Sequence, residues 1–251
     1  MLILVDDHLK KEKNKIMKRI YGTTVTPTIA ASKQHLGAFT GDDVLFDWVA
    51  LKIPKNAVLD HVSYLAPGVD NAGQQFGVNF LFAKNNNVSM GTVHANCTGH
   101  FERDQLIGIH SVAAADRVVD ISEGLHRFYH STIGNPSNGV VFADYDNDLD
   151  TTTNPGFITV YVGATMVGTP NLSTGVIVNK ASDYAAEASA TIITNGEDAD
   201  KTIRPGHVIH AQDDAVLGTV SSVTANLITL TAVNVGALED DDELYIVNPI
   251  K

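Results

Sequence analysis

The 251-residue chain contains a single cysteine, Cys97. One thiol excludes an intramolecular disulfide and any zinc site built from several cysteines. No apolar run approaches the roughly 20 residues that a membrane-spanning helix needs. The opening MLILV is followed at once by Asp6 and Asp7, without a basic leader or a small-residue cleavage site, so a signal peptide is not expected. Stability is therefore expected to come from core packing or from assembly.

Basic residues are also scarce. Lys and Arg number 17 against 29 Asp and Glu, which gives a formal charge of −12. This balance argues against nucleic-acid binding, because phosphate contacts need Lys and Arg. The charge is uneven: residues 1–22 have a net charge of +3, whereas residues 23–174 and 175–251 have −7 and −8. We expect the basic start to be either a solvated terminus or an arm that docks on an acidic surface of a neighbouring subunit.

Residues 1–32 are predicted to form an N-terminal arm. Within it, the segment DDHLKKEKNKIMKRI at 6–20 has acids at its start and bases at its end, which suits the dipole of a short helix. Its apolar positions are sparse, so this helix is not expected to be stable alone. Met17 is an alternative start, and a functional role of residues 1–16 stays open at this point. The Thr-, Ala- and Pro-rich segment that follows is expected to be extended.

Alternating apolar residues, which are typical of half-buried strands, dominate residues 33–168. VLFDWVALKIP and AVLDHVSYLAP end at Pro54 and Pro67. QQFGVNFLFAK predicts a strand with one buried face formed by Phe76, Val78, Phe80 and Phe82. Further strands are expected at 88–95, 106–113, 117–121 and 139–143, and LHRFYHS at 125–131 fits a strand or a helical turn.

The segment GFITVYVGATM at 156–166 is apolar on both faces, which is typical of a central or an inter-subunit strand. Together the strands predict an all-β chain with a jelly-roll-like β-sandwich at 33–168. Pro, Gly, Ser and Thr cluster at 166–175 and indicate a boundary. Four short alternating segments between residues 203 and 249 predict a small β-barrel-like domain at 175–251, although ASDYAAEAS at 181–189 has helical character.

Two acidic runs are candidates for cation binding. DYDNDLD offers Asp144, Asp146, Asp148 and Asp150 at alternate positions, which suits Ca²⁺, but the Gly and Glu of an EF-hand are missing. A solvated acidic loop is the simpler interpretation. The run EDDDE at 239–243 is interpreted as a charged turn that protects a strand edge, with binding of a cation or a basic partner as the alternative.

Ten histidines raise the question of a metal site. Three groupings stand out by their spacing: His126 with His130, His207 with His210, and His94 and His100 around Cys97. No HExxH motif occurs, so scattered surface histidines are favoured, and they would make assembly pH-sensitive if they titrate near neutrality. The motifs GxSxG and GxxxxGK[ST] are absent as well. A Ser–His–Asp triad stays open because its members meet only in the fold. No catalytic, cofactor-binding or metal-binding residue is assigned.

Three segments resemble known proteins. PGHVIHAQDDAVLGTVSSVTANLITLTAVNVGALEDDDELYIVNPI is similar to a module of structural proteins of tailed bacteriophages, notably those of marine cyanobacteria. FDWVALKIPKNAVLDHVSYLAPG and GFITVYVGA resemble β-sandwich virion proteins of such phages. These are strand-and-turn patterns with no catalytic residue to transfer. The resemblance implies a virion component of the capsid decoration (cement) type, and it leaves the basic N-terminal extension unexplained.

The resemblance implies a non-enzymatic protein that binds the major capsid protein, assembles in the host cytoplasm and resides in the virion. A homo-oligomer is expected, with a trimer favoured, and no cofactor, nucleic acid or membrane partner. The strand at 157–163 and the N-terminal arm are the candidate contact elements. One alternative is a tail, knob or fibre component that binds a host receptor or glycan, for which exposed aromatics would serve: Trp48, Phe128 and Tyr129. Another is a polysaccharide hydrolase, which would need paired carboxylates that only Asp144–Asp150 offers.

Overall fold

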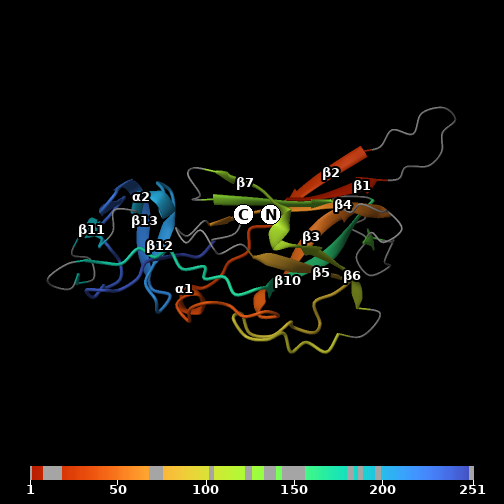
Figure 1. Cartoon of the computed structure of the whole chain (residues 1–251), viewed down its shortest axis with the longest axis horizontal. Helices are drawn as coiled ribbons and strands as arrows, with labels where there is room; N and C mark the ends of the chain where they lie inside the picture. Colours follow the sequence, from red (N-terminus) through yellow and green to blue (C-terminus); the bar gives the residue numbers. More distant parts are fainter. Residues whose placement is uncertain are drawn as a thin grey trace.

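The computed structural model describes residues 2–7, 19–67, 76–101, 105–121, 126–132, 140–142, 156–179, 184–185, 189–195 and 199–248. The described strands form three antiparallel sheets in two domains (Figure 1). Two sheets make a β-sandwich, and the third makes the smaller C-terminal domain. The prediction of an all-β chain with a sandwich is confirmed. None of the helices in the described residues is long and apolar enough to cross a membrane.

The first sheet of the sandwich has the strand order β2-β1-β4-β8-β7, and β9 also pairs with β4. Its strands are β1 (Leu2–Asp7), β2 (Arg19–Thr24), β4 (Ala57–Pro67), β7 (Arg117–Ile121), β8 (His126–Thr132) and β9 (Val141–Phe142). The sequence predicted either a strand or a helical turn at 125–131. The structure shows that this segment forms the strand β8.

The N-terminal residues belong to this sheet. β1 pairs with both β2 and β4, so the described part of residues 1–24 is not a separate arm. The helix predicted at 6–20 is wrong at both of its described ends, which lie in β1 and β2. Backbone pairing with an existing sheet outweighs the weak helical preference of a short segment with few apolar positions. Residues 8–18 lie outside the described residues.

The second sheet has the strand order β3-β10-β5-β6. Its strands are β3 (Val44–Pro54), β5 (Gly77–Ala83), β6 (Leu106–Val112) and β10 (Phe157–Val167). The 3-10 turn η1 (Ala114–Asp116) leads from β6 into β7 and so from one sheet to the other. The strand predicted at 88–95 is wrong, because these residues form a loop with one isolated bridge at Val93.

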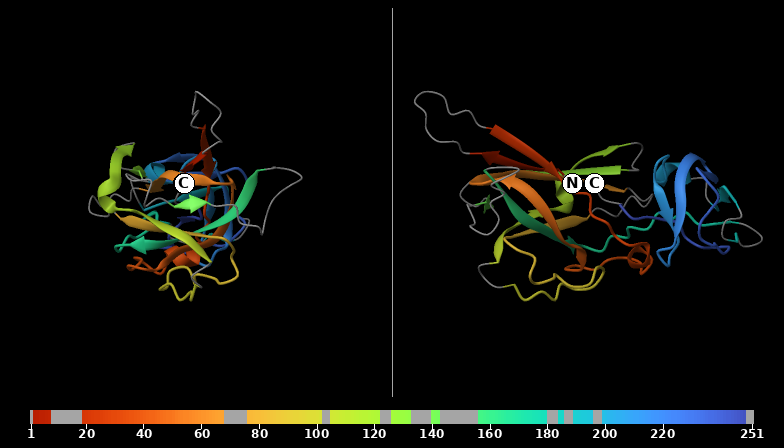
Figure 2. Two further views of the ribbon diagram at one scale, coloured as in Figure 1. Left: turned by 90° about the vertical axis from the view of Figure 1, so that its right-hand side faces the viewer. Right: turned by 180° about the vertical axis from the view of Figure 1, so that it is seen from behind.

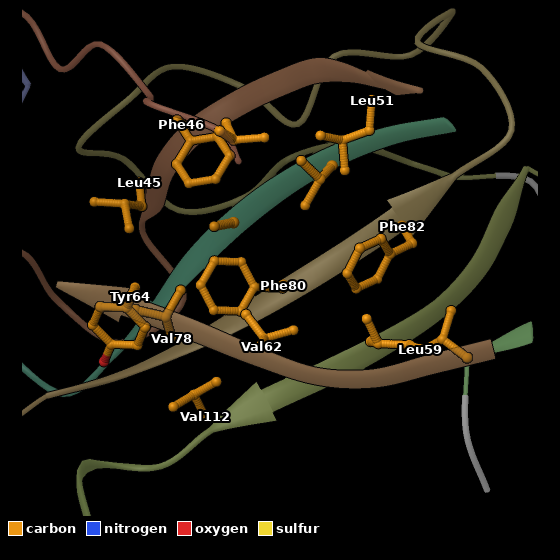
Figure 3. Packing of buried hydrophobic residues seen from close by; sticks show 14 of the residues in the cluster. Leu45, Phe46, Leu51, Leu59, Val62, Tyr64, Val78, Phe80, Phe82 and Val112 are labelled. Carbon is orange, nitrogen blue, oxygen red and sulfur yellow. The ribbon is translucent and has the colours of Figure 1, made fainter. Parts of the chain in front are cut away.

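One hydrophobic core fills the space between the two sheets (Figure 3). Alternate residues of β5 and the residue before it point into this core, and Phe76, Val78, Phe80 and Phe82 are all buried as predicted. Leu59, Val62 and Tyr64 of β4 approach them from the other sheet. Burial of each such large apolar side chain contributes about 1.5–3 kcal/mol, so this layer is the main source of the sandwich's stability.

The outer face of the four-stranded sheet is covered by the loop at 84–101. Met90 of this loop is fully buried against Val44 and Leu81. Asp47 on β3 anchors the loop through its carboxylate, which accepts hydrogen bonds from the Ser89 hydroxyl at 2.6 Å and the Met90 amide at 3.0 Å. Both faces of this sheet carry buried apolar side chains because other parts of the same chain cover them.

The strand predicted as a contact element, 157–163, lies in β10 between β3 and β5. Ile158, Val160 and Val162 face the sandwich core, and Gly163 lies under Met90 and Trp48. Its interpretation as a central strand is confirmed. Its assignment as a contact with another subunit is wrong, because the chain itself covers both faces.

The C-terminal domain contains a five-stranded antiparallel sheet with the order β11-β14-β13-β12-β15. Its strands are β11 (Thr191–Ile193), β12 (Val208–His210), β13 (Val216–Thr224), β14 (Leu227–Leu230) and β15 (Tyr245–Ile246), and the short helix α2 (Ala199–Thr202) precedes β12. The order is an open path, and its two edges are connected by isolated bridges from residues 177 and 178 to Glu243 and Thr194. Tyr184 forms a bridge with Leu238, so the segment at 181–189 is not helical at this residue, although its composition has helical character.

Each domain has its own buried core. The cluster of the sandwich extends to Leu172, and that of the C-terminal domain begins at Val176. Residues 25–39, which we call the strap, connect β2 to β3 and include the short helix α1 (Ala31–Gln34). The strap lies at the junction of the two domains (Figures 1 and 2). It therefore links the sandwich to the C-terminal domain, although it comes from the N-terminal part of the sequence.

Candidate functional site

A polar cluster lies on β4, where this strand has a β-bulge. The partners of β1 shift from His61 to Leu59 at this point, so Asp60 is the extra residue. Leu59 and Val62 are both buried in the core, and the bulge turns Asp60 and His61 away from it. Bulges of this kind re-aim side chains, and they occur often beside functional sites.

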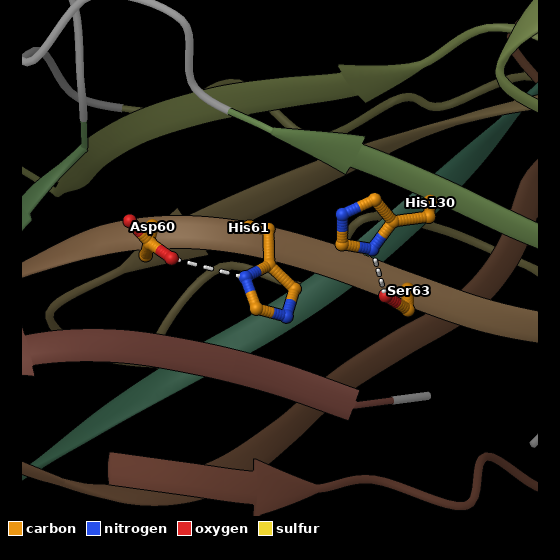
Figure 4. Close-up of polar contacts among 4 residues, drawn as sticks. All are labelled: Asp60, His61, Ser63 and His130. Carbon is orange, nitrogen blue, oxygen red and sulfur yellow. Dashed lines mark hydrogen bonds and ion pairs between the residues drawn. The ribbon is translucent and has the colours of Figure 1, made fainter. Parts of the chain in front are cut away.

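Four side chains of β4 and β8 meet at the bulge (Figure 4). His61 Nδ1 lies 3.1 Å from a carboxylate oxygen of Asp60, and His130 Nδ1 lies 2.7 Å from the Ser63 hydroxyl. The centroids of the two imidazole rings are 4.6 Å apart. Ser63 and His130 are direct partners in the register of β4 and β8, which brings the imidazole to the hydroxyl.

This cluster does not have the geometry of a hydrolase triad. Ser63 is only 3% exposed, so its hydroxyl is shielded from a substrate. The carboxylate of Asp60 contacts His61, whereas the hydroxyl of Ser63 contacts His130, so the three functional groups do not act through one imidazole. Each of the four side chains has one hydrogen-bond partner within the cluster, and we assign them a structural role on the outer face of the sheet.

The other candidate ligands do not gather into a metal site within the part of the chain that the structure describes. No group of three His, Cys, Asp or Glu side chains there is close enough to hold an ion. His94, His207 and His210 each hydrogen-bond to a backbone group of another residue. The loop Asp144–Asp150 and the side chain of His126 lie outside the described residues, so the calcium hypothesis stays a prediction.

The acidic run at 239–243 forms a turn, as its sequence indicates. The Glu239 amide donates to the Asp242 carboxylate at 2.8 Å. Glu243 has a different role, because its carboxylate accepts hydrogen bonds from the Tyr245 hydroxyl at 2.6 Å and from the Gly175 amide at 2.8 Å. Gly175 lies in the connection between the domains, so Glu243 joins β15 to that connection. Sequence reasoning missed this role, since nothing distinguishes Glu243 from its acidic neighbours.

The aromatic residues considered for glycan stacking do not lie exposed at loop tips. Tyr129 is fully buried in the sandwich core. Trp48 lies within β3, where its indole is partly buried and packs edge-on against Phe101. Phe128 lies within β8 and is also partly buried. The feature that would favour the glycan-binding alternative is therefore missing at these three positions.

Exposed apolar side chains coincide with a sheet edge at β7. This strand ends the path β2-β1-β4-β8-β7 of its sheet. Val118 and Val119 are 61% and 47% exposed, and the register shifts between Arg117 and Val119. An edge strand presents backbone groups that can pair with another chain, and a bulge limits indiscriminate pairing. Other described edge strands expose at most one large apolar side chain each, for example Ile20 on β2, Ile109 on β6 and Ile193 on β11. β7 exposes two adjacent ones, and we therefore take it as the candidate binding edge.

Comparisons with known proteins do not place the chain in a family. No protein-family model matches it, and neither a curated protein nor a solved structure matches it significantly.

Proposed function

We propose that the chain is a non-enzymatic structural protein of a phage virion that binds the capsid shell as a decoration (cement) protein. The observation that carries this proposal is the β7 edge, where two neighbouring valines, Val118 and Val119, are exposed on the last strand of the sheet's path among the described residues. The resemblance of the strand-and-turn segments to phage virion proteins supplies the context. The partner is the major capsid protein.

Binding through β7 follows from the chemistry of sheet edges. A strand of the partner adds to the edge through main-chain hydrogen bonds, and the exposed side chains determine which strand fits. Val118 and Val119 favour a partner with a complementary apolar surface. The acidic body of residues 23–174 favours a partner surface with basic residues around that contact.

Stabilisation of the shell follows from mass action. A protein that binds only the assembled shell lowers the free energy of that state, and the effect grows with its concentration relative to the dissociation constant. The chain would act as a homo-oligomer, with a trimer favoured at symmetry axes of the shell. It would be made in the host cytoplasm and reside in the finished virion.

The test uses capsid shells that lack this protein. Purified protein is added, bound protein is measured by co-sedimentation, and shell melting is followed by calorimetry. We expect saturable binding and a higher melting temperature. Val118→Lys should weaken binding at least tenfold, because it places a charge in the apolar contact.

Val235→Lys is the matched control, since Val235 is 62% exposed but lies in the C-terminal domain. An unchanged shell melting temperature together with no co-sedimentation would contradict the proposed function. Equal weakening by Val118→Lys and Val235→Lys would contradict the assignment of β7.

A further inference from the structure

We propose that the strap at residues 25–39 is a latch that fixes the C-terminal domain on the sandwich, and that Gln34 is its central positioning residue. When the latch opens, the two domains reorient about the short connection at residues 173–175. This inference concerns the two domains of one chain, and it holds whatever surface the chain binds.

The covalent connection between the two cores is short. Leu172 is buried in the core of the sandwich, and Val176 is buried in the core of the C-terminal domain. Gly175 between them has a φ of +68°, in the left-handed region, and a Cβ built at this position would meet nothing within 4 Å. Glycine adopts this conformation without the steric cost that other residues incur, so the connection is suited to act as a hinge.

The strap contacts both domains at once. The side chains of Val25, Ile29 and Phe39 belong to the hydrophobic cluster of the sandwich. The backbone amide of Ile29 donates to the Val247 carbonyl of the C-terminal domain at 2.7 Å. The strap is thus held by apolar packing on one domain and by hydrogen bonds on the other.

Gln34 makes the most buried polar contact of the strap. Its side chain is fully buried, and Nε2 donates to the carbonyls of Ile29 and Ile246, both at 2.8 Å. One amide group thus joins the strap to β15. Its Oε1 atom is buried and has no hydrogen-bond partner within the described ranges, which lowers local stability. A buried amide that adds little stability but connects two domains is best explained as a positioning group.

A second contact lies at the surface of the junction. The carboxylate of Asp214 accepts hydrogen bonds from the backbone amide of Ser32 at 2.9 Å and from its hydroxyl at 2.6 Å. These two bonds occupy both carboxylate oxygens and therefore fix the direction of approach of α1. The contact is exposed to solvent, so its substitution does not create a cavity.

A third contact reaches the hinge. Tyr245 donates its hydroxyl hydrogen to Glu243 at 2.6 Å, so it accepts a hydrogen bond from His35 Nδ1 at 3.0 Å. The same Glu243 carboxylate accepts from the Gly175 amide at 2.8 Å. A continuous series of hydrogen bonds therefore runs from the strap, through β15, to the hinge residue. Without the hydrogen bond between His35 and Tyr245, the strap no longer restrains Tyr245 and Glu243, and the hinge at Gly175 should become more mobile.

The experiment compares the tumbling of the two domains by amide relaxation in the full-length chain. We expect one rotational correlation time for both domains of the unsubstituted protein. Gln34→Leu keeps the volume but removes both donors, and it should give two different, shorter correlation times. Protease cleavage at residues 173–175 should become about tenfold faster, the factor expected for the loss of the one buried hydrogen bond that crosses from Gln34 to Ile246.

Ser111→Ala is the control, because Ser111 makes an exposed 2.6 Å hydrogen bond to Asn79, within the sandwich sheet of β5 and β6. It should leave both measurements unchanged. If Gln34→Leu does not fold, the double variant Ser32→Ala, His35→Ala decides in the same assay, since both residues are partly or largely exposed. Independent tumbling in the unsubstituted protein, or unchanged tumbling and cleavage in the variant, would overturn the proposal.

Discussion

Tyr64 and Tyr129 stack face to face in the sandwich core, with ring centroids 4.6 Å apart and planes inclined by 8°. They are direct partners in the register of β4 and β8. Their hydroxyls bind both backbone groups of Phe76: Tyr64 donates to the carbonyl at 2.9 Å, and the amide donates to Tyr129 at 3.4 Å. The pair therefore fixes the point at which β5 enters the core.

Removal of the Tyr64 hydroxyl should cost stability. In Tyr64→Phe, the buried carbonyl of Phe76 loses this donor, and the free energy of unfolding should fall by about 1–3 kcal/mol. Tyr129→Phe should cost less, because its hydrogen bond is longer. Urea denaturation of both single variants and the double variant measures this. If Tyr64→Phe is as stable as the unsubstituted chain, the hydrogen bond from Tyr64 to Phe76 does not fix the entry of β5 into the core.

The same tyrosine should make the protein sensitive to alkali. Burial raises the pKa of Tyr64, and the nearby Tyr129 and Asp116 raise it further. A tyrosine in the unfolded chain titrates near 10, so above about pH 10 the unfolded state releases a proton that the folded state retains. The stabilisation is complete below that pH and is lost as the pH rises.

Urea midpoints between pH 9 and pH 11 test this dependence. Tyr64→Phe should reduce the decrease of the urea midpoint with rising pH. Part of that decrease should remain, because burial and Glu243 also raise the pKa of Tyr245. Tyr21→Phe is the control on β2, since Tyr21 is only partly buried. If Tyr64→Phe leaves the decrease of the urea midpoint with pH unchanged, Tyr64 is not a source of the alkaline instability.

His110 should make the protein sensitive to mild acid. Burial lowers its pKa, against the opposing effects of a hydrogen bond with the Ser131 backbone and the charge of Asp116. Its buried Nε2 atom has no hydrogen-bond partner among the described residues. Histidine in the unfolded chain titrates near 6.5, so stability is complete above that pH and falls as the pH drops toward the lower folded value.

His110→Asn removes this titration and should flatten the dependence of stability on pH between about 5 and 7. The matched control is His100→Asn, because His100 is exposed on the loop that follows Met90. Calorimetry at several pH values in this range measures both variants. Equal flattening by the two substitutions would show that burial of His110 is not the cause.

Gly163 on β10 should not tolerate a side chain. A Cβ atom there would lie 2.1 Å from Met90 Sδ and 3.1 Å from Trp48 Cε3. Gly163→Ala should lower the free energy of unfolding by about 1–3 kcal/mol, because the loop at 84–101 has to move outward. Trp48 is the only tryptophan, so a red shift of its fluorescence would report that movement.

Met90→Ala provides the internal control for this crowding. On its own it should cost about 2–5 kcal/mol, because it leaves a cavity. It also makes room for a Cβ at position 163, so Gly163→Ala should cost much less in the Met90→Ala background. Additive losses in the double-mutant cycle would contradict direct contact between these two residues.

Local patterns in the sequence predicted much of the sandwich. The ends of β3 and β4 at Pro54 and Pro67 follow from the apolar alternation that precedes each proline, and both are confirmed. The buried face of Phe76 to Phe82 is confirmed for the same reason, since residues two apart in a strand share a face. These features depend only on residues that are close in the sequence, so the sequence is sufficient to predict them.

Long-range contacts explain the errors. The residues at 6–20 have helical charge spacing, but pairing with β4, some fifty residues later, makes their described ends strands. The apolar residues at 88–95 alternate like a strand, but they cover the outer face of a sheet as a loop anchored by Asp47. Neither outcome is visible in a local window, because the partner that decides it is distant in sequence.

The sequence by itself determined that this protein is all-β, which residues face the core of the sandwich, and that a turn-rich segment follows β10. Only the tertiary structure decided how the domains are held together. Gln34, His35 and Glu243 have no distinguishing neighbours in the sequence, yet they meet β15 and the connection at Gly175. Hydrogen bonds between such distant residues exist only after both cores have formed, so the fold, rather than any local pattern, creates the junction.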